Sequence, residues 1–499
     1  MQEFKKTPGI EARGALKRAV CLVSASVLSG CFSVAHPELI SKPLAALAVP
    51  IPAALPPVGW WTALNDPVLD DLANRALEGS FSVQAAAIRL KEAQGLDAAT
   101  IWSLGPKTQL SDQFEGTHTM KYQQNGLPPF TFPSGLSDTK TKSFQATWEL
   151  PLFGKAAAVK AQGRAKEEQA RFQLEAAKLA VVAELVRDYT SWQGSCAEIA
   201  AFEQEERTFA GLEDLETAVK AAGYSTQAEI DRLETQRLGI RAQLNTAQTQ
   251  RNQFSIKIAA LLALPDASEL PAGIQSCGDA PLAAAPLITE IPANALRLRP
   301  DVRISEQLVA IAAAQAGAAR AATYPQLTLG GSLIFNTGAL DTYGGTMGVA
   351  NVRNITGGLT IPLLDWFALH AQAKAAKTEL QAAVFDYRQT LVSAWDETRE
   401  SFEDYSSALI IIKNLEVRAE LAHTDVLRTS DKAARGYGTR QEVLKAEYGY
   451  EEARRALTDA QATSLVNWAK LEKASFVVYD PPPKPVAEKP VDEEEAYAN

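Results

Sequence analysis

One cysteine stands in the sequence context that bacteria use to attach lipid to an exported protein. Five basic residues precede an apolar run over 19–28, and the chain then reads Leu28-Ser29-Gly30-Cys31. The charged and then apolar order is typical of a secretory signal, and small residues before a cysteine match the bacterial lipobox, in which that thiol receives a diacylglycerol. We therefore expect residues 1–30 to be a signal peptide and Cys31 to carry lipid. The alternative is an ordinary signal peptide that holds a cysteine there by chance.

The other residues of chemical interest form no catalytic or metal-binding pattern. No histidine has metal-ligand spacing to another His or Cys, and the four stand far apart at His36, His118, His370 and His423. The sequence contains neither a glycine-rich phosphate loop nor a nucleophile elbow. It thus predicts no metal, no cofactor and no enzyme. In an oxidising periplasm, Cys196 and Cys277 could form a disulfide or remain two buried thiols.

A short polar motif occurs twice, in a register that the surrounding residues keep. The segment Gly223-Tyr224-Ser225-Thr226-Gln227-Ala228-Glu229 returns as Gly436-Tyr437-Gly438-Thr439-Arg440-Gln441-Glu442, a shift of 213 residues (436 − 223). The same shift pairs further identical residues, namely Arg241 with Arg454, Leu244 with Leu457, Ala247 with Ala460 and Gln248 with Gln461. Because chance rarely keeps one register for so long, we expect an internal duplication.

Long proline-free segments in each repeat predict unusually long helices. Residues 155–222 contain no proline, and a helix of about 65 residues would be roughly 100 Å long. A similar segment covers 370–435. Gly223 and Gly436 follow these segments, and glycine tolerates the backbone angles that end a helix. We also expect return helices to about Leu264 and Phe476, and an earlier helix from Asp66 to about Leu104.

Four short segments alternate polar and apolar residues, as strands with one lipid-facing side do. They are expected to pair as two hairpins, 108–115 with 143–150 and 327–335 with 354–361. The alternative is a pair of half-buried hairpins in a soluble protein. No stretch reaches the roughly 18 uninterrupted apolar residues of a membrane-spanning helix. Because four strands cannot close a barrel and lipid does not tolerate open strand edges, we expect three chains to share one barrel.

These stretches together resemble the TolC-like outer membrane factors, in particular the NodT-type lipoproteins of resistance-nodulation-division (RND) efflux pumps. The resemblance runs from Cys31 to about Phe476 and rests on Trp60-Trp61 through Asn65-Asp66-Pro67-Val68-Leu69, Trp148-Glu149-Leu150-Pro151-Leu152-Phe153-Gly154, Leu298-Arg299-Pro300-Asp301-Val302, Ala318-Ala319-Arg320 through Tyr324-Pro325-Gln326-Leu327, and Pro362-Leu363-Leu364-Asp365. It implies a mainly α fold with a small β part, built as a trimer. Each chain would give four strands to a twelve-stranded outer-membrane β-barrel, above an equatorial domain and a long periplasmic α-helical barrel.

The resemblance also implies a gate and a docking surface at the two helix reversals. Polar contacts at the periplasmic tips hold the family's closed constriction, and the residues expected to form it here are Tyr437, Arg440, Glu442, Glu447, Tyr224 and Glu229. The residues expected to contact a periplasmic adaptor are Gly223, Thr226, Gly438 and Thr439. Lys445 departs from the family's acidic pattern at its position. For each charged residue the alternative role is an ordinary solvent-exposed helix cap.

The function implied is that of a passive exit duct. A homotrimer in outer-membrane lipid would be coupled, through a periplasmic adaptor, to an inner-membrane pump that exports drugs, solvents or metals. One alternative is the duct of a type I protein secretion system. Another, from a different class, is a periplasmic coiled-coil adaptor, although adaptors carry one helical hairpin and this chain carries two.

The expected segments follow the same scheme. They are a signal peptide at 1–30, a lipidated arm at 31–58, a first repeat at 59–264, a Pro-rich equatorial linker at 265–292, a second repeat at 293–479 and a disordered, acidic, Pro-rich tail at 480–499. Loss of residues 1–30 removes five basic and two acidic residues, so the formal net charge changes from −10 to −13. Such an acidic chain is not a nucleic-acid binder by charge.

Overall fold

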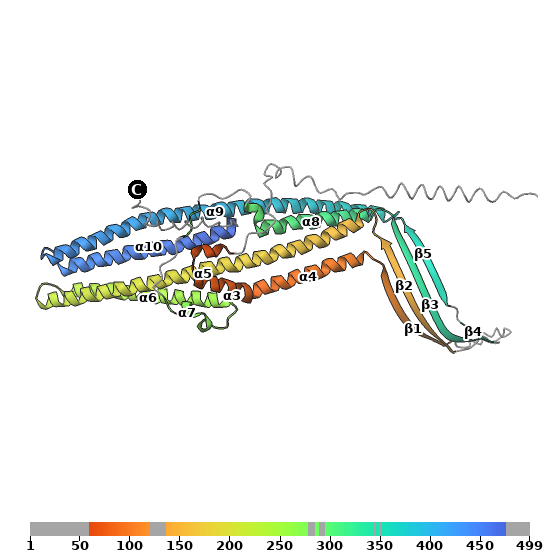
Figure 1. The fold of residues 1–499 in the computed structure, drawn as a ribbon, viewed down its shortest axis with the longest axis horizontal. Helices are drawn as coiled ribbons and strands as arrows, with labels where there is room; N and C mark the ends of the chain where they lie inside the picture. Colours follow the sequence, from red (N-terminus) through yellow and green to blue (C-terminus); the bar gives the residue numbers. More distant parts are fainter. Residues whose placement is uncertain are drawn as a thin grey trace, which may run out of the picture. The chain divides into compact units, whose positions relative to one another are not determined.

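The computed structural model describes residues 59–118, 136–277, 285–288, 295–342, 345–348 and 351–475 (Figure 1). The predicted signal peptide, Cys31, the arm at 31–58 and the tail at 480–499 lie outside the described residues. The chain forms two compact units, and each draws on both repeats. Within the described residues, the first unit holds Lys91–Gln169 and Ser305–Tyr387, and the second holds the rest.

The first unit contains one antiparallel sheet. Its strands are β1 (Lys107–His118), β2 (Leu136–Leu150), β3 (Gln326–Thr342), β4 (Gly345–Gly348) and β5 (Val352–Thr360). Strand β1 pairs with β2, β2 pairs with β3, and β3 pairs with both β4 and β5. All four predicted strands are therefore present, and each is longer than expected. The pairing of β2 with β3, which joins the hairpins of the two repeats, was not predicted.

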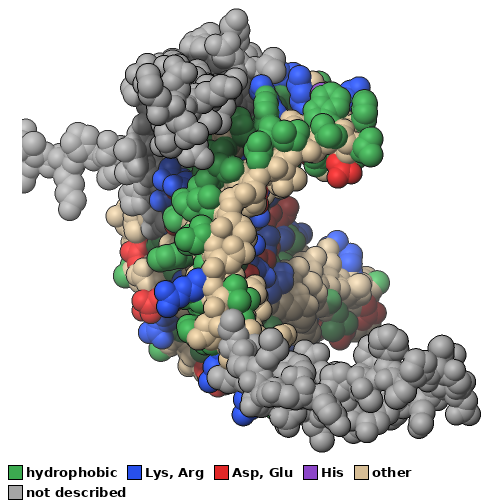
Figure 2. All heavy atoms as spheres, turned by 90° about the vertical axis from the view of Figure 1, so that its right-hand side faces the viewer, with side chains coloured by type: hydrophobic (Ala, Val, Ile, Leu, Met, Phe, Trp, Pro, Cys, Tyr) green, Lys and Arg blue, Asp and Glu red, His purple; other side chains and the backbone are tan. Residues whose placement is uncertain are grey.

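The register gives this sheet one apolar and one polar face. Leu110 of β1 lies opposite Phe144 of β2, and Phe144 lies opposite Leu333 of β3. Because strand side chains alternate between faces, the face that carries these three also carries, in order of strand, Thr108, Asp112, Phe114, Lys140, Lys142, Ala146, Trp148, Leu150, Leu327, Leu329, Gly331, Phe335, Arg353, Ile355, Gly357 and Leu359. We call it the apolar face. Figure 2 shows hydrophobic side chains exposed along the strands.

The opposite face is polar and partly cross-linked by hydrogen bonds. Ser111 and Ser143 lie 2.7 Å apart between their hydroxyl oxygens. The Thr141 hydroxyl donates to the Asn336 side chain at 2.9 Å. Gln, Thr, Ser and Asn residues occupy most of the remaining positions. This face therefore suits water, whereas the apolar face does not.

The long helices lie where the sequence predicts them. They are α5 (Lys155–Ala221), α6 (Gln227–Leu261), α9 (Trp366–Ala434) and α10 (Arg440–Ser475). Helix α7 (Ala272–Gln275) lies between the repeats, and α8 (Pro300–Ala321) lies near the start of the second repeat. Helix α8 was not predicted, although Pro300 and Asp301 form a favourable first turn. No helix among the described residues is long and apolar enough to cross a membrane.

The single helix predicted from Asp66 to Leu104 is wrong. The structure has two helices, α3 (Pro67–Gly79) and α4 (Phe81–Ser103), separated by Ser80 in an extended conformation. The Gly79-Ser80 pair explains the break, because glycine weakens a helix and serine favours helix ends. Asp66 begins α3 by accepting hydrogen bonds from the backbone N–H groups of Val68 at 2.9 Å and Leu69 at 3.2 Å.

The core of the second unit joins the start of the first repeat to the end of the second. Fully buried side chains of α3, α5, α9 and α10 meet there, among them Leu69, Leu72, Val182, Tyr405 and Trp468. The second oxygen of Asp66 accepts a hydrogen bond from the Tyr189 hydroxyl of α5 at 2.7 Å, so one carboxylate both caps α3 and fixes it to α5. Cys196 of α5 and Cys277, after α7, form a disulfide.

Glu472 of α10 is a charged residue type inside this core. Its side chain is 1% exposed, and neither carboxylate oxygen has a hydrogen-bond partner in the described part of the chain. Burial raises the pKa of Glu472 to about 8. The neighbouring Trp468 indole offsets only a small part of this rise. The folded protein therefore holds this group as a neutral acid at neutral pH.

We expect Glu472→Gln to stabilise the protein increasingly as the pH rises. Between about pH 4.5 and 8 the folded chain holds a proton that the unfolded chain has lost, so the wild type loses roughly 1.4 kcal/mol per pH unit relative to the variant. The apparent melting temperature from pH 5 to 9 measures this difference. Exposed Glu403→Gln is the control and should track the wild type. Parallel curves for wild type and Glu472→Gln would contradict the burial argument.

Candidate functional site

The two helix reversals share one backbone geometry. Gly223 and Gly436 have φ values of 85° and 79°, a region that side chains other than glycine rarely adopt. After each glycine the tyrosine N–H bonds back to the helix, Tyr224 to the Val219 carbonyl at 3.1 Å and Tyr437 to the Lys432 carbonyl at 2.9 Å. This is the Schellman arrangement, which satisfies the last carbonyls of a helix. The repeated Gly-Tyr pair thus ends α5 and α9 in the same way.

The helices that leave the two reversals begin differently. Thr439 and Glu442 form a capping box, in which the Thr439 hydroxyl accepts from the Glu442 N–H at 3.2 Å and the Glu442 carboxylate accepts from the Thr439 N–H at 3.0 Å. The side chain of Thr226 makes no such bond. Glu229 instead pairs with Arg232 at 2.7 Å, and this hydrogen bond lowers the pKa of Glu229. The repeat therefore keeps the sequence of the cap but not its contacts.

The predicted gate residues project into solvent in one chain. Tyr224 is 86% exposed and Tyr437 is 84% exposed. Arg440 pairs with Glu447 of the same helix at 3.5 Å, and this ion pair is also largely exposed. The structure thus brings Arg440 and Glu447 together, and separately Thr439 and Glu442. The gating role itself stays a prediction.

A residue that the sequence analysis missed links the two reversals. Glu216, in the last turns of α5, is 6% exposed. It accepts hydrogen bonds from the Ser225 hydroxyl of the first reversal and from the Gln441 amide of α10, the latter at 3.3 Å. The repeat shift places Thr429 at the equivalent position. The signal available in the sequence was a glutamate near the end of the first long helix where the second repeat has a threonine.

Further along the hairpins, α5 packs against α10 through mixed contacts. Phe209 meets Tyr448 edge to face at 4.9 Å between ring centroids. Glu205, 1% exposed, pairs with Arg455 at 3.1 Å, and the Arg455 guanidinium also lies 4.7 Å from the Phe202 ring. Burial raises the pKa of Glu205, and Arg455 offsets part of that effect. These contacts join the first repeat to the second.

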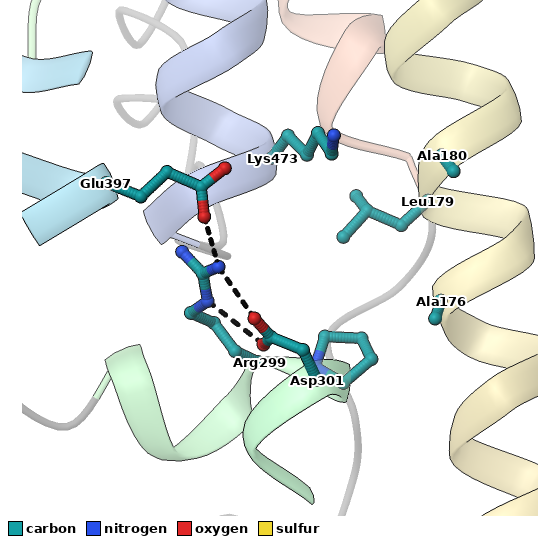
Figure 3. Close-up of a pocket in the computed structure, with 8 residues that line it drawn as sticks. Ala176, Leu179, Ala180, Arg299, Asp301, Glu397 and Lys473 are labelled. Atoms are coloured by element: carbon teal, nitrogen blue, oxygen red, sulfur yellow. Dashed lines mark hydrogen bonds and ion pairs between the residues drawn. The ribbon is translucent and has the colours of Figure 1, made fainter. Parts of the chain in front are cut away.

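The Leu-Arg-Pro-Asp motif forms an anchor beside a cavity of about 210 Å³ (Figure 3). Arg299 donates to Asp301 at 2.8 Å and also to Glu397 of α9. Its other nitrogen donates to the Ala474 carbonyl at 2.6 Å, at the end of α10. Burial alone would raise the pKa of Asp301, but the Arg299 guanidinium lowers it overall. Because its donors are directed at protein acceptors, Arg299 is an anchor of α8, α9 and α10 rather than a ligand site.

No group of three or more His, Cys, Asp or Glu side chains among the described residues could hold a metal ion.

This combination of a strand sheet with one apolar face and two capped helical hairpins defines a class of channel protein. The family model described as outer membrane efflux protein matches residues 72–264 and again residues 291–475. The chain belongs to the outer membrane efflux protein family, and the double match confirms the internal duplication. The adaptor alternative is thereby set aside.

Individual relatives agree with this assignment. Nodulation protein T of Rhizobium leguminosarum bv. trifolii is 24% identical over 83% of this chain and 85% of its own length. Outer membrane protein OprJ of Pseudomonas aeruginosa is 25% identical over 83% of this chain and 82% of its own. The solved outer-membrane channel OprN superposes with a TM-score of 0.72 at 22% identity, covering 86% of this chain and 94% of that one. VceC of Vibrio cholerae gives 0.70 at 22% identity, covering 84% and 98%.

We expect Arg299→Ala to destabilise the protein by about 2–3 kcal/mol. Removing one partner of a buried ion pair costs about 3–5 kcal/mol, and we reduce this because Asp301 and Glu397 are each 49% exposed. Chemical denaturation measures the change. Arg418→Ala is the control, since its pair with Glu452 is exposed on both sides, and it should cost less than about 1 kcal/mol. Equal effects of the two substitutions would contradict the anchoring role.

Proposed function

We propose that the protein is the outer-membrane exit duct of a tripartite efflux pump of the RND class. The observation that carries the proposal is the sheet of the first unit, with one apolar and one polar face and two unpaired edges. Strand β1 pairs only with β2, and β5 only with β3, among the described residues. An open edge exposes backbone N–H and C=O groups, which lipid does not tolerate. Neighbouring chains therefore have to supply the missing partners.

Three copies satisfy this requirement in the simplest way. With the four longer strands of each chain, β1 of one protomer can pair with β5 of the next, and twelve strands close. The apolar face would then meet outer-membrane lipid and the polar face would line a water-filled lumen. Cys31 with its lipid would add a second attachment to the same membrane.

The helical reversals suit a surface that meets other proteins. Exposed Tyr224 and Tyr437 present large rings with a polar tip, a residue type favoured at interfaces. We propose that Tyr437, Arg440, Glu442, Glu447, Tyr224 and Glu229 form the periplasmic gate of the trimer, and that Gly223, Thr226, Gly438 and Thr439 contact the adaptor of an inner-membrane pump.

The cargo class follows only from the range of relatives. Their names include a pyoverdine export protein, a toluene efflux protein and a multidrug resistance protein. We propose small-molecule efflux for this chain, with the adaptor and the inner-membrane pump selecting the substrate.

The purified protein should be a trimer that requires detergent. Light scattering or native mass spectrometry after detergent extraction measures the assembly, and Leu333→Glu, on the apolar face opposite Phe144, should reduce insertion because it puts a charge into lipid. Thr141→Glu, on the polar face, is the matched control and should assemble normally. A soluble monomer would remove the basis of the proposed function.

We expect the double variant Tyr437→Phe with Arg440→Ser to raise single-channel conductance in planar bilayers. Polar contacts at a closed constriction contribute little one by one but a few kcal/mol as a network over three copies. The control is Tyr450→Phe with Arg454→Ser, the same chemical changes further along α10. Unchanged conductance on trimeric protein would identify Tyr437 and Arg440 as ordinary surface residues and move the gate elsewhere in the tip.

A further inference from the structure

The strands at the two edges of the sheet are repeat equivalents of the two strands that pair at its centre (Figure 1). Strand β5 corresponds to β2, because Pro151-Leu152 and Pro362-Leu363 follow these strands at a shift of 211 residues (362 − 151). Strand β1 corresponds to β3, because Pro106 and Pro325 precede them at a shift of 219 residues (325 − 106). The pairing of β2 with β3 inside one chain is therefore a template for the pairing of β5 with β1 between two copies.

The template specifies a register. Trp148 of β2 lies opposite Leu329 of β3, and Phe144 lies opposite Leu333, all four on the apolar face. The equivalent of a β2 residue in β5 is found by adding 211, and that of a β3 residue in β1 by subtracting 219. The equivalent contacts between two copies are then Leu359 with Leu110 and Ile355 with Phe114.

The exposure of the edge strands agrees with such a contact. On the two inner strands the apolar-face side chains of Phe144, Leu329 and Leu333 are 41%, 43% and 38% exposed, because strands flank them on both sides. On the edge strands the four side chains of the template contact are 64–93% exposed, namely Leu110, Phe114, Ile355 and Leu359. The excess is surface that one further strand would cover.

The main competing register is displaced by two residues. Leu110 lies opposite Phe144 in the first hairpin, whereas Leu329 lies opposite Gly357 in the second, where strict equivalence would give Ile355. The two hairpins thus differ by two residues, and the seam between copies could differ from the template in the same way. Displacement by one residue is excluded, because it would turn the apolar side chains of one strand to the polar face.

Side-chain pairing favours the template register. The register displaced by two would set Ile355 opposite Asp112 and Arg353 opposite Phe114, so that each pair joins a charge to an apolar side chain. The template register instead sets Asp112 opposite Gly357 and apolar residues opposite each other, as stable cross-strand pairs require. A displacement by four would pair Arg353 with Asp112 but would leave two of the nine β5 residues beyond the start of β1.

We propose that β5 of one copy pairs with β1 of the next in the register that sets Leu359 opposite Leu110 and Ile355 opposite Phe114. All nine residues of β5 then lie opposite residues of β1. The inference rests on the proposed function, because it requires several copies to share one barrel. The seam between copies would thereby repeat the seam between the two repeats of a single chain.

Disulfide cross-linking of the detergent-solubilised full-length trimer measures this register. Gln113→Cys with Thr356→Cys places two cysteines opposite each other on the polar face, where directly paired Cα atoms lie about 4.5–5.5 Å apart and a disulfide can form. We expect covalent dimers and trimers on denaturing gels after oxidation. Within one chain β2 and β3 separate the two strands, so the bond can form only between copies.

The matched controls keep Gln113→Cys and move the second cysteine along β5. Asn354→Cys would be opposite in the register displaced by two, and Val352→Cys in the register displaced by four. In the proposed register the nearer of these positions is a diagonal neighbour about 7–8 Å away, beyond disulfide reach, so both controls should remain monomeric on the gel. Cross-linking of either control in place of the Thr356→Cys variant would overturn the proposed register while leaving the shared barrel intact.

A second cysteine pair keeps the test decisive if the polar-face variant fails to assemble. Leu110→Cys with Leu359→Cys reports the same register from the apolar face, with an oxidant that dissolves in the detergent micelle, and should also give covalent dimers and trimers. A detergent-requiring trimer in which no pair cross-links would overturn the proposal, because β1 and β5 would then not be partners. A wild-type protein that is not a detergent-requiring trimer would instead refute the proposed function.

Discussion

Hydrogen bonding at the edges of one small sheet is the constraint on which the rest of the structure depends. Two hairpins, one from each repeat, pair through β2 and β3, so a single chain is left with two edges instead of four. Lipid provides no partner for the remaining edges. That requirement explains why the hairpin unit is duplicated and why the two copies pair side by side. Pairing with other chains would remove the two edges that remain.

The two repeats then differ where they perform different tasks. Their helix ends stay alike, because Gly223 and Gly436 satisfy the same backbone need. The helices that follow the two reversals begin differently, with a full capping box at Thr439 and Glu442 but none at Thr226. Glu216 has Thr429 as its counterpart. Backbone geometry is therefore retained by both copies, while the side-chain contacts at the tips have specialised.

Features governed by local sequence could be predicted, and those governed by distant contacts could not. Proline-free segments, alternating strands and glycine reversals located the long helices, the four main strands and both tips. The break at Ser80 depended on a two-residue signal inside a strong helical pattern, and was missed. The pairing of β2 with β3, the anchoring of α9 and α10 by Arg299 and the bridge at Glu216 join residues 98 to 225 positions apart, which no periodicity encodes.

Buried polar pairs have a specific purpose between such long helices. Helix α5 has 67 residues and α10 has 36, and burial of apolar surface alone does not fix one register between two such helices, because the hydrophobic effect is non-directional. Glu205 with Arg455, and Glu216 with Gln441, would be separated by any such displacement. An unpaired buried charge is strongly destabilising. The pairs therefore favour one register, which holds the end of α5 beside the start of α10.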